Sequence, residues 1–365
     1  MTHAPDRLGQ TVRQCHVSRR GIGRAGLLLL AVLAMPCNLA QADSLFPEPG
    51  LTNPKLRFAT GRVVGNQPEV SPDLPNIPGP PSDWVVGQWQ HTHYLSSNDQ
   101  VPAPTIGDAR YGGALYAFNA PFDESHLWIF HDRASYVFEL FERDGVLRGG
   151  GANLFLSAKA STEATLDKPI DYALSARISR AEAAYWTATA EASGAVMGQV
   201  FSGFVLRFAD PQSPRRINMF LQIPIAASRP GHGSYRSCNA GAEIVGVTAN
   251  ESLDRDPPLA FAADPGPLRP LRLRLNDYVC AVITHPAACA QPGGRSTQLG
   301  AFARVRDLHN WRLQAMYVGL ETQARDLRPG AVTAVPQGSV AVGVQLSGLS
   351  ITRDEGRNYG DGFCH

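Results

Sequence analysis

The stretch Ser339–Ile351, SVAVGVQLSGLSI, decides the fold class of this protein. Apolar side chains recur there at every second position, namely Val340, Val342, Val344 and Leu346. Gly348 then shifts the register, and Leu349 and Ile351 continue the apolar row. Because successive side chains of a β-strand point to opposite faces, this period predicts a long strand with one buried face and a bulge at Gly348.

The same two-residue period recurs through the chain from Trp84 onward. Apolar residues alternate with others in Asp171–Ser179, Ile217–Ile225 and Leu271–Leu275. Glycine and proline turns separate such segments, and helical periodicity is nearly absent. We therefore predict an all-β fold, with one large antiparallel β-sandwich or jelly roll over residues 84–365.

The first 42 residues predict a cleaved signal peptide. Arg13, Arg19, Arg20 and Arg24 precede the apolar run Ala25–Ala34, and Ala40-Gln41-Ala42 offers a small-residue cleavage site. The run of about ten residues is too short to span a bilayer, and no second hydrophobic segment follows it. We expect a protein exported to the periplasm or the exterior, without stable membrane insertion after cleavage. The pair Arg19-Arg20 leaves Sec and twin-arginine export open.

Residues 43–83 contain nine prolines and show no steady period, which predicts an extended arm lying over the sandwich. Removal of residues 1–42 takes away five of the 33 basic residues and one of the 32 acidic ones, leaving a net charge of −3. This balance argues against nucleic acid as a partner. The glycine clusters lack the strand-to-helix setting of a phosphate loop, and we expect no cofactor.

Four cysteines follow the leader: Cys238, Cys280, Cys289 and Cys364. An even number in an exported protein predicts two disulfides, and a zinc site is the weaker alternative because there is no C-x-x-C pair. Of the three possible pairings, we expect Cys280 with Cys289, which flank a proline-containing loop. Cys238 would then bind the C-terminal Cys364.

Two segments near the C-terminus, Trp311–Glu321 (WRLQAMYVGLE) and Ser339–Ile351, resemble the closing strands of concanavalin A-like lectin and glucanase sandwiches. The resemblance covers about 40 residues. It implies two curved sheets with a concave face that holds a glycan. It transfers no catalytic residue, because neither an E-x-D-x-x-E strand nor a Q-[IV]-H strand occurs in this sequence.

The stretch Trp89–Tyr94, WQHTHY, places two histidines beside Trp89 on one face of an expected strand. Two imidazoles at this spacing can start a metal site, but no third ligand follows at a suitable distance, so we expect no metal. An imidazole beside an indole also suits sugar binding or acid–base chemistry. If neither applies, the histidines are hydrogen-bonded at the edge of the core. The candidate catalytic residues are His91 or His93 as base, with Glu139 or Tyr94 as partner.

The segment Ile217–Ile225 places Asn218, Phe220 and Gln222 on the face opposite its apolar row. Amides pair with hydroxyl groups and aromatic rings stack on the C–H faces of sugars, so this face, together with Trp89, is a candidate glycan-binding surface. An ordinary solvated outer face shows the same pattern.

Two functions agree with these observations. The first is a secreted carbohydrate-active protein that binds, or binds and cleaves, a polysaccharide in a concave groove. The second is a noncatalytic envelope or extracellular scaffold that uses its proline-rich arm to contact another protein. Carbohydrate chemistry requires polar and aromatic side chains that converge in a cleft, whereas a scaffold would scatter them over the surface.

Overall fold

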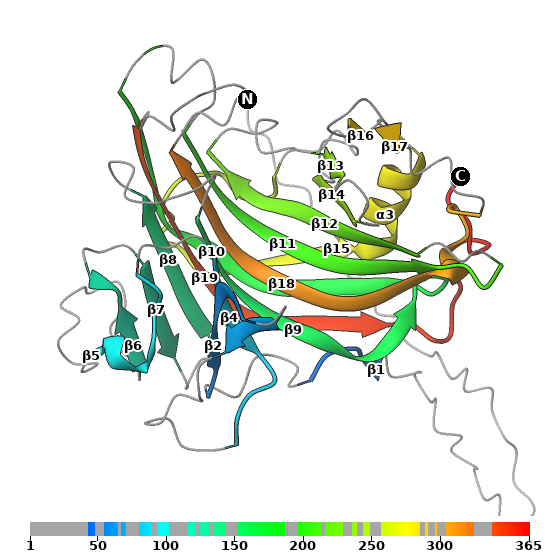
Figure 1. Ribbon diagram of the computed structural model, residues 1–365, viewed down its shortest axis with the longest axis horizontal. Helices are drawn as coiled ribbons and strands as arrows, with labels where there is room; N and C mark the ends of the chain where they lie inside the picture. Colours follow the sequence, from blue (N-terminus) through cyan, green and yellow to red (C-terminus); the bar gives the residue numbers. More distant parts are fainter. Residues whose placement is uncertain are drawn as a thin grey trace, which may run out of the picture. The chain divides into compact units, whose positions relative to one another are not determined.

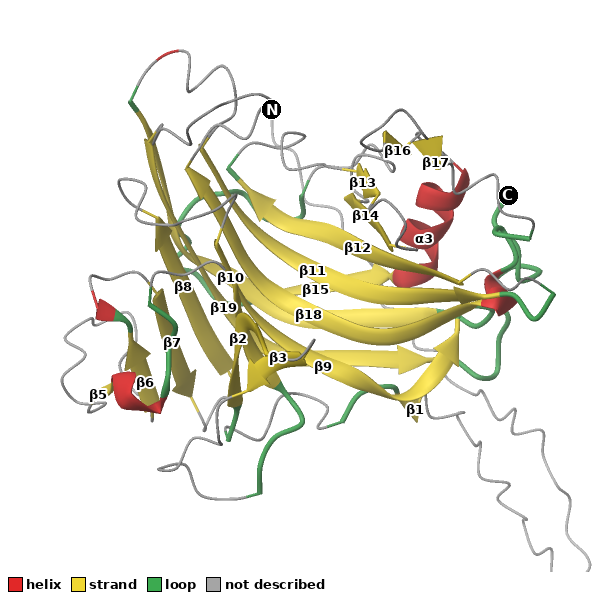
Figure 2. Ribbon diagram, in the orientation of Figure 1, coloured by secondary structure: helices red, strands yellow, loops and turns green. Residues whose placement is uncertain are grey.

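Two large β-sheets packed against each other form most of the part of the chain that the structure describes (Figures 1 and 2). The computed structural model describes residues 43–47, 55–64, 67–70, 80–89, 93–101, 116–121, 125–130, 135–142, 152–186, 188, 196–212, 216–228, 236–238, 244–248, 257–284, 289–290, 296–297, 304–324 and 338–365. All of them belong to one compact unit, residues 40–365. The predicted antiparallel β-sandwich is confirmed, and the predicted leader lies outside the described residues.

The first sheet has eight strands in the order β15-β10-β19-β8-β7-β6-β5, with β1 also paired to β19. Its strands are β1 (Asp43–Ser44), β5 (Gln100–Val101), β6 (Tyr116–Asn119), β7 (Ser125–Phe130), β8 (Ser135–Glu142), β10 (Ile170–Tyr185), β15 (Arg269–Arg274) and β19 (Gly338–Arg353). Every pairing in this sheet is antiparallel.

The second sheet has nine strands in the order β13-β14-β12-β11-β18-β9-β4-β2-β3. Its strands are β2 (Arg57–Val64), β3 (Gln67–Val70), β4 (Val85–Trp89), β9 (Ala152–Thr165), β11 (Val196–Ala209), β12 (Arg216–Ala227), β13 (Arg236–Cys238), β14 (Ile244–Thr248) and β18 (Trp311–Ala324). The pairs β2–β4 and β12–β14 are parallel, and the other pairs are antiparallel.

The strand predicted from Ser339–Ile351 is β19, which lies between β10 and β8. Its alternating residues Val342, Val344 and Leu346 are buried in the core between the sheets. The register against β10 shifts opposite Gly348, which has a φ of 63°. The predicted bulge is therefore present, and glycine suits it because a side chain would disfavour this left-handed backbone.

The segment Leu271–Leu275 is only partly a strand, because β15 ends at Arg274 and the helix α3 (Leu275–Thr284) begins at Leu275. The buried Asn276 fixes this change of direction. Its Oδ1 accepts a hydrogen bond from Ile170 N at 2.8 Å, and its Nδ2 donates to Leu166 O at 2.6 Å. The remaining short elements are η1 (Ser97–Asp99), η7 (Leu308–Asn310), β16 (Cys289–Ala290) and β17 (Ser296–Thr297). No helix in the described ranges is both long and apolar enough to cross a membrane.

The disulfide in the described residues joins Cys280 of α3 to Cys364. The expected pairings of Cys280 with Cys289 and of Cys238 with Cys364 are therefore wrong. Cys280 lies within the helix α3, which continues to Thr284, and Cys289 belongs to the separate strand β16. The C-terminal segment is held against α3, where Tyr359 Oη also donates a hydrogen bond to Asp277 at 2.7 Å.

Parts of the proline-rich region 43–83 belong to the sheets. β1 pairs with β19, and β2 pairs with β4 in parallel register. Trp84, which follows this region, is buried and donates a hydrogen bond from Nε1 to Pro47 O at 3.1 Å. The region thus contributes an edge of the nine-stranded sheet, next to β4.

Candidate functional site

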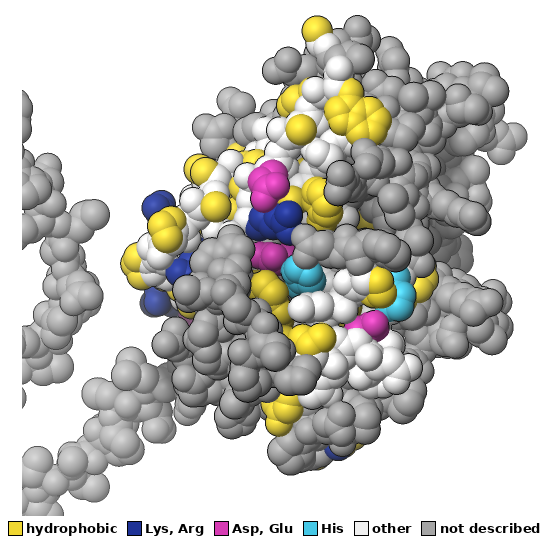
Figure 3. Space-filling view, turned by 90° about the vertical axis from the view of Figure 1, so that its left-hand side faces the viewer, with side chains coloured by type: hydrophobic (Ala, Val, Ile, Leu, Met, Phe, Trp, Pro, Cys, Tyr) yellow, Lys and Arg dark blue, Asp and Glu magenta, His cyan; other side chains and the backbone are white. Residues whose placement is uncertain are grey.

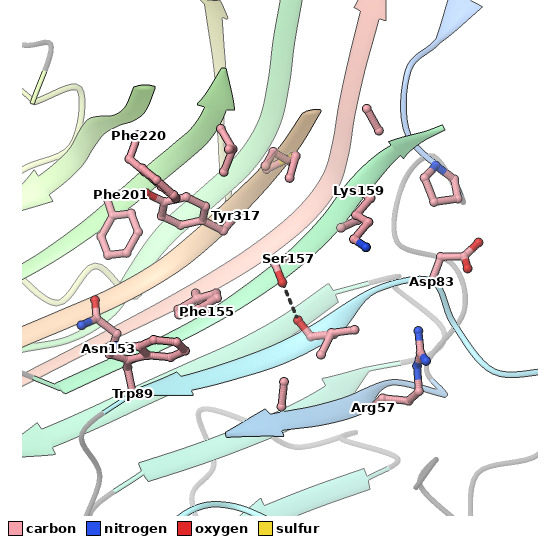
Figure 4. Close-up of a pocket in the computed structure, with 18 of the residues that line it drawn as sticks. Arg57, Asp83, Trp89, Asn153, Phe155, Ser157, Lys159, Phe201, Phe220 and Tyr317 are labelled. Atoms are coloured by element: carbon pink, nitrogen blue, oxygen red, sulfur yellow. Dashed lines mark hydrogen bonds between the residues drawn. The ribbon is translucent and has the colours of Figure 1, made fainter. Parts of the chain in front are cut away.

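A groove of ≈ 1020 Å³ crosses the face of the nine-stranded sheet that points away from the core (Figure 4). Its side chains come from β2, β4, β9, β11, β12 and β18. Residues that alternate with the groove residues, such as Val86, Leu154 and Phe204, face the other sheet and are fully buried. Alternate side chains of these strands therefore form two surfaces: one set packs in the core, and the other set lines the groove.

Cross-strand pairing sets the order of the side chains on the groove floor. The first row is Trp89, Asn153, Glu321 and Gln199, of which Trp89 and Asn153 line the groove and the other two lie beside it. The second row is Gly87, Phe155, Gly319 and Phe201. The third row is Arg57, Val85, Ser157, Tyr317, Gly203 and Gln222. The fourth row is Lys159, Ala315, Val205 and Phe220. Since residues two apart on a strand share a face, the four rows form one continuous surface.

Two aromatic rings lie over glycines of the neighbouring strands. A Cβ on Gly87 would overlap the ring of Phe155, and a Cβ on Gly203 would overlap the ring of Tyr317. The centroids of Tyr317 and Phe155 are 5.5 Å apart, and Phe201 meets Tyr317 edge-on at 5.5 Å. Figure 4 shows Phe201, Phe220, Tyr317 and Phe155 along one part of the groove, with Trp89 beside Asn153. Glycine is what allows the rings to lie low on the floor, because it leaves space above the strand.

Polar groups lie between the rings. Asn153 and Ser157 line the groove on β9, and Ser157 Oγ donates a long hydrogen bond to Val85 O at 3.4 Å. Gln222 is buried, and its Oε1 has no hydrogen-bond partner among the described residues. A buried carbonyl oxygen without a partner costs free energy, which a bound donor would recover.

Charged side chains gather at the other end of the groove. Arg57 on β2, Lys159 on β9 and Asp83 just before β4 line it there (Figure 4). Lys159 and Asp83 are exposed, whereas Arg57 is half-buried. The groove thus combines an aromatic half with a half that carries two cations and one carboxylate.

Glu321 is the carboxylate of the first row. It is half-buried between Gln199 and Asn153, and Gln199 Nε2 donates a hydrogen bond to its Oε2 at 2.6 Å. Burial raises the pKa of Glu321, and the hydrogen bond from Gln199 opposes this effect. A carboxyl group that keeps its proton to a higher pH beside a groove is suited to act as a general acid.

Three of the four predicted binding residues line the groove, namely Trp89, Phe220 and Gln222. Asn218 lies on the same face of β12, opposite Arg207 and one row beyond Phe220, but outside the groove lining. The expected alternation of this strand holds, since Met219 and Leu221 are fully buried on its other face.

None of the predicted catalytic residues that the structure describes lines the groove. His91 lies outside the described residues. β4 ends at Trp89, and His93 and Tyr94 lie in the following loop, where His93 Nε2 pairs with Asp99 Oδ1 at 2.9 Å. The side chain of Gln88 stabilises this loop. Its Nε2 donates a hydrogen bond to Leu95 O at 2.9 Å, and its Oε1 accepts one from Leu95 N at 2.6 Å. Neither His93 nor Tyr94 lines the groove.

Glu139 lies on β8 of the eight-stranded sheet. It is buried, accepts a hydrogen bond from Ser179 Oγ at 3.1 Å and lies 3.4 Å from Nδ1 of His126. Figure 3 shows the side of the protein where β5 to β8 lie, on which acidic, basic and histidine side chains gather. Within the described ranges, no three His, Cys, Asp or Glu side chains are arranged to hold a metal ion.

Phe155, Phe201 and Tyr317 are groove residues that the sequence analysis missed. A signal for Phe201 exists in β11, VMGQVFSGFVLRFA, where apolar residues occupy both faces. Such a strand has a second apolar contact besides the core, and here that contact is the groove. The other available signal was a glycine two residues after Phe201 and after Tyr317, namely Gly203 and Gly319.

No protein-family model matches the chain, and no curated protein matches it. Similar solved structures include a cellulase derived from the Cel12A cellulase of Rhodothermus marinus, at 10% identity and a TM-score of 0.33, covering 66% of this chain and 91% of that one. A second is the xyloglucanase domain of NopAA, a type three effector from Sinorhizobium fredii in complex with cellobiose, at 7% identity and a TM-score of 0.29, covering 67% and 94%. A third is the family 11 xylanase from Neocallimastix patriciarum, at 9% identity and a TM-score of 0.29, covering 65% and 100%. These similarities assign no role to any residue of this chain.

Proposed function

We propose that this protein binds a polysaccharide in the groove of its nine-stranded sheet. The observation that carries the proposal is the floor on which Phe155 and Tyr317 lie over glycines, with amide and hydroxyl groups between them. Aromatic faces suit the C–H faces of sugar rings, while Asn153, Ser157 and Gln222 suit their hydroxyl groups.

The dimensions of the groove favour a chain over a single sugar. The third row crosses β12, β11, β18, β9 and β4 before it reaches β2. Neighbouring strands lie about 4.8 Å apart, so this row is about 24 Å long. An extended polymer can contact the rings and amides in turn. A scaffold, the alternative function, requires no such convergence of aromatic and polar groups on one floor.

Two exposed tryptophans provide a matched test. Trp89 borders the groove and is 42% exposed, whereas Trp186 follows β10 of the other sheet and is 50% exposed. We expect Trp89→Ala to weaken polysaccharide binding in titration calorimetry by about 1 kcal/mol or more, and Trp186→Ala to leave it unchanged. Equal effects of the two substitutions, or no binding of any polysaccharide by the unmodified protein, would contradict the proposal.

Glu321 favours cleavage as a second candidate activity. Its raised pKa suits a general acid, and it lies in the row of Trp89 and Asn153. Hydrolysis by the usual mechanism requires a second carboxyl group across the scissile bond, and the cross-strand neighbours of Glu321 are the amides Gln199 and Asn153. Release of reducing ends by the native protein and its loss in Glu321→Gln would establish cleavage. If no reducing ends are released, the activity is binding alone.

We also propose that the protein is exported and that cleavage precedes Asp43. The disulfide between Cys280 and Cys364 supports an oxidising compartment, because disulfides rarely persist in the cytosol. N-terminal sequencing of the protein from cell fractions tests this point. A mature chain that begins at Met1 and stays with the cytoplasm would contradict it.

A further inference from the structure

We infer that the polysaccharide is acidic and that its anionic groups bind at the Arg57 end of the groove. This inference deepens the proposed function and rests on it. Arg57 lines the groove from β2, and its Nε is buried without a hydrogen-bond partner among the described residues. A guanidinium N–H in this state lacks the acceptor that such groups normally have.

Arg57 also lacks the ion pair that other arginines among the described residues form. Arg274, for example, pairs with Asp171 at 3.0 Å, and Arg353 pairs with Asp167 at 3.3 Å. Within the described part of the chain, neither Arg57 nor Lys159 forms an ion pair, although both face the same groove. The charges of these two side chains are therefore not neutralised by an ion pair with a described carboxylate.

The Arg57 end of the groove has more cations than carboxylates. Lys159 is one of only three lysines in the whole sequence. Arg207, outside the groove lining, follows two residues after Val205 on the same face of β11. Asp83 is the opposing carboxylate at this end of the groove. The end as a whole carries a positive excess on a chain whose predicted mature form has a net charge of −3.

Arginine donates two parallel hydrogen bonds to a planar or tetrahedral oxyanion, and lysine adds a mobile charge. An acidic glycan could offer either a carboxylate or a sulfate for this contact. The aromatic half of the groove would meanwhile hold the sugar rings, so charge and stacking would act on the same chain at different positions. A hydroxyl group of a neutral glucan can accept a hydrogen bond from a guanidinium, but it carries no charge to offset those of Arg57 and Lys159.

The test compares galacturonate oligomers, sulfated dextran oligomers and neutral cello-oligosaccharides of similar length by calorimetry with the mature protein. We expect one of the acidic ligands to bind at least about tenfold more tightly than the neutral one. Arg57→Gln and Lys159→Gln should each reduce this preference by about three- to tenfold. Arg306→Gln, which removes an exposed charge outside the groove, is the matched control. Arg57→Lys retains the charge, and its thermal midpoint shows whether position 57 tolerates change.

The outcomes separate this inference from the proposed function. Neutral ligands bound as tightly as both acidic ones, with loss of binding in Trp89→Ala, would overturn the inference and leave polysaccharide binding intact. Equal losses in Arg57→Gln and Arg306→Gln would also overturn it. So would polyglutamate bound as tightly as the acidic glycans, because the groove would then select charge alone. Failure of every saccharide to bind would refute the proposed function itself.

Discussion

Gly203→Ala tests whether the aromatic floor depends on glycine. Gly203 lies on β11 directly opposite Tyr317 of β18. A new Cβ would overlap the ring, and even the third-nearest ring atom, Cε1, would lie only 2.6 Å away, against 3.4 Å for ordinary contact. The ring must therefore retreat by at least about 0.8 Å at this atom. Because the obstacle is the end of a side chain, Tyr317 can swing into the groove without movement of the backbone.

The expected change in the free energy of unfolding follows from the contacts that Tyr317 would lose. Its ring lies 5.5 Å from the rings of both Phe155 and Phe201, and each such pair contributes about 0.5–1.5 kcal/mol. Replacement of a glycine within a strand by alanine gains back about 0.5–1 kcal/mol of backbone entropy. We expect a net loss of about 1–2 kcal/mol in the free energy of unfolding, measured in urea. Polysaccharide affinity should fall as well, because the displaced ring raises the floor.

A double-mutant cycle that combines Gly203→Ala with Tyr317→Ala tests this reasoning. In a Tyr317→Ala background the clash is absent, so Gly203→Ala should become neutral or stabilise the fold by up to about 1 kcal/mol. The same destabilisation in both backgrounds would refute the reasoning. Gly319→Ala is the contrasting variant, since its Cβ would overlap backbone atoms of Leu154 and Phe155, which cannot move aside. It should cost more than about 4 kcal/mol whatever residue occupies position 317.

Three further predictions concern stability. Gln88→Leu should cost about 2–4 kcal/mol in urea unfolding, because it leaves both backbone groups of Leu95 buried without partners; a cost under 1 kcal/mol would mean that water replaces the amide. The raised pKa of Glu321 means that the folded protein retains a proton that the unfolded chain has released, so stability should fall as the pH rises above about 4.3 and through the folded pKa. Glu321→Gln should lack this fall, and parallel pH curves for the two proteins would contradict the assignment. Replacement of Cys280 and Cys364 by alanine should lower the free energy of unfolding by about 4–5 kcal/mol, because the bond closes a separation of 84 residues; reduction of the native protein should reproduce the loss.

The sandwich could be predicted because its signal is local. The two-residue period of β19 follows from the geometry of a strand, and Gly348 marks the bulge within the same segment. The helix α3 was missed for a related reason. Its ten residues follow β15 without a break, and Asn276, which ends the strand, acts through partners about 110 residues earlier in the sequence.

The histidine pair shows where local periodicity fails. The pattern from Trp84 to Leu95 alternates throughout, but β4 ends at Trp89. Gln88 faces the core and hydrogen-bonds the backbone of Leu95, a contact that a strand continued to Leu95 would not allow. Trp89, the last residue of β4, lies on the face that the pattern predicts and borders the groove. His93 instead pairs with Asp99.

The groove floor could not have been derived from any one segment, because it depends on strand order and register together. Tyr317 lies over Gly203 only because β18 is the neighbour of β11 and residue 317 is opposite residue 203. A slip of one residue would exchange the faces of the whole strand and place Met316 or Val318 in the groove, with the tyrosine in the core. Register is fixed by burial of the apolar set on the other face, of which Met316, Val318 and Leu320 are fully buried members. The core between the sheets therefore determines the positions of the rings that would contact a glycan, and substitutions in that core should alter binding without touching the groove.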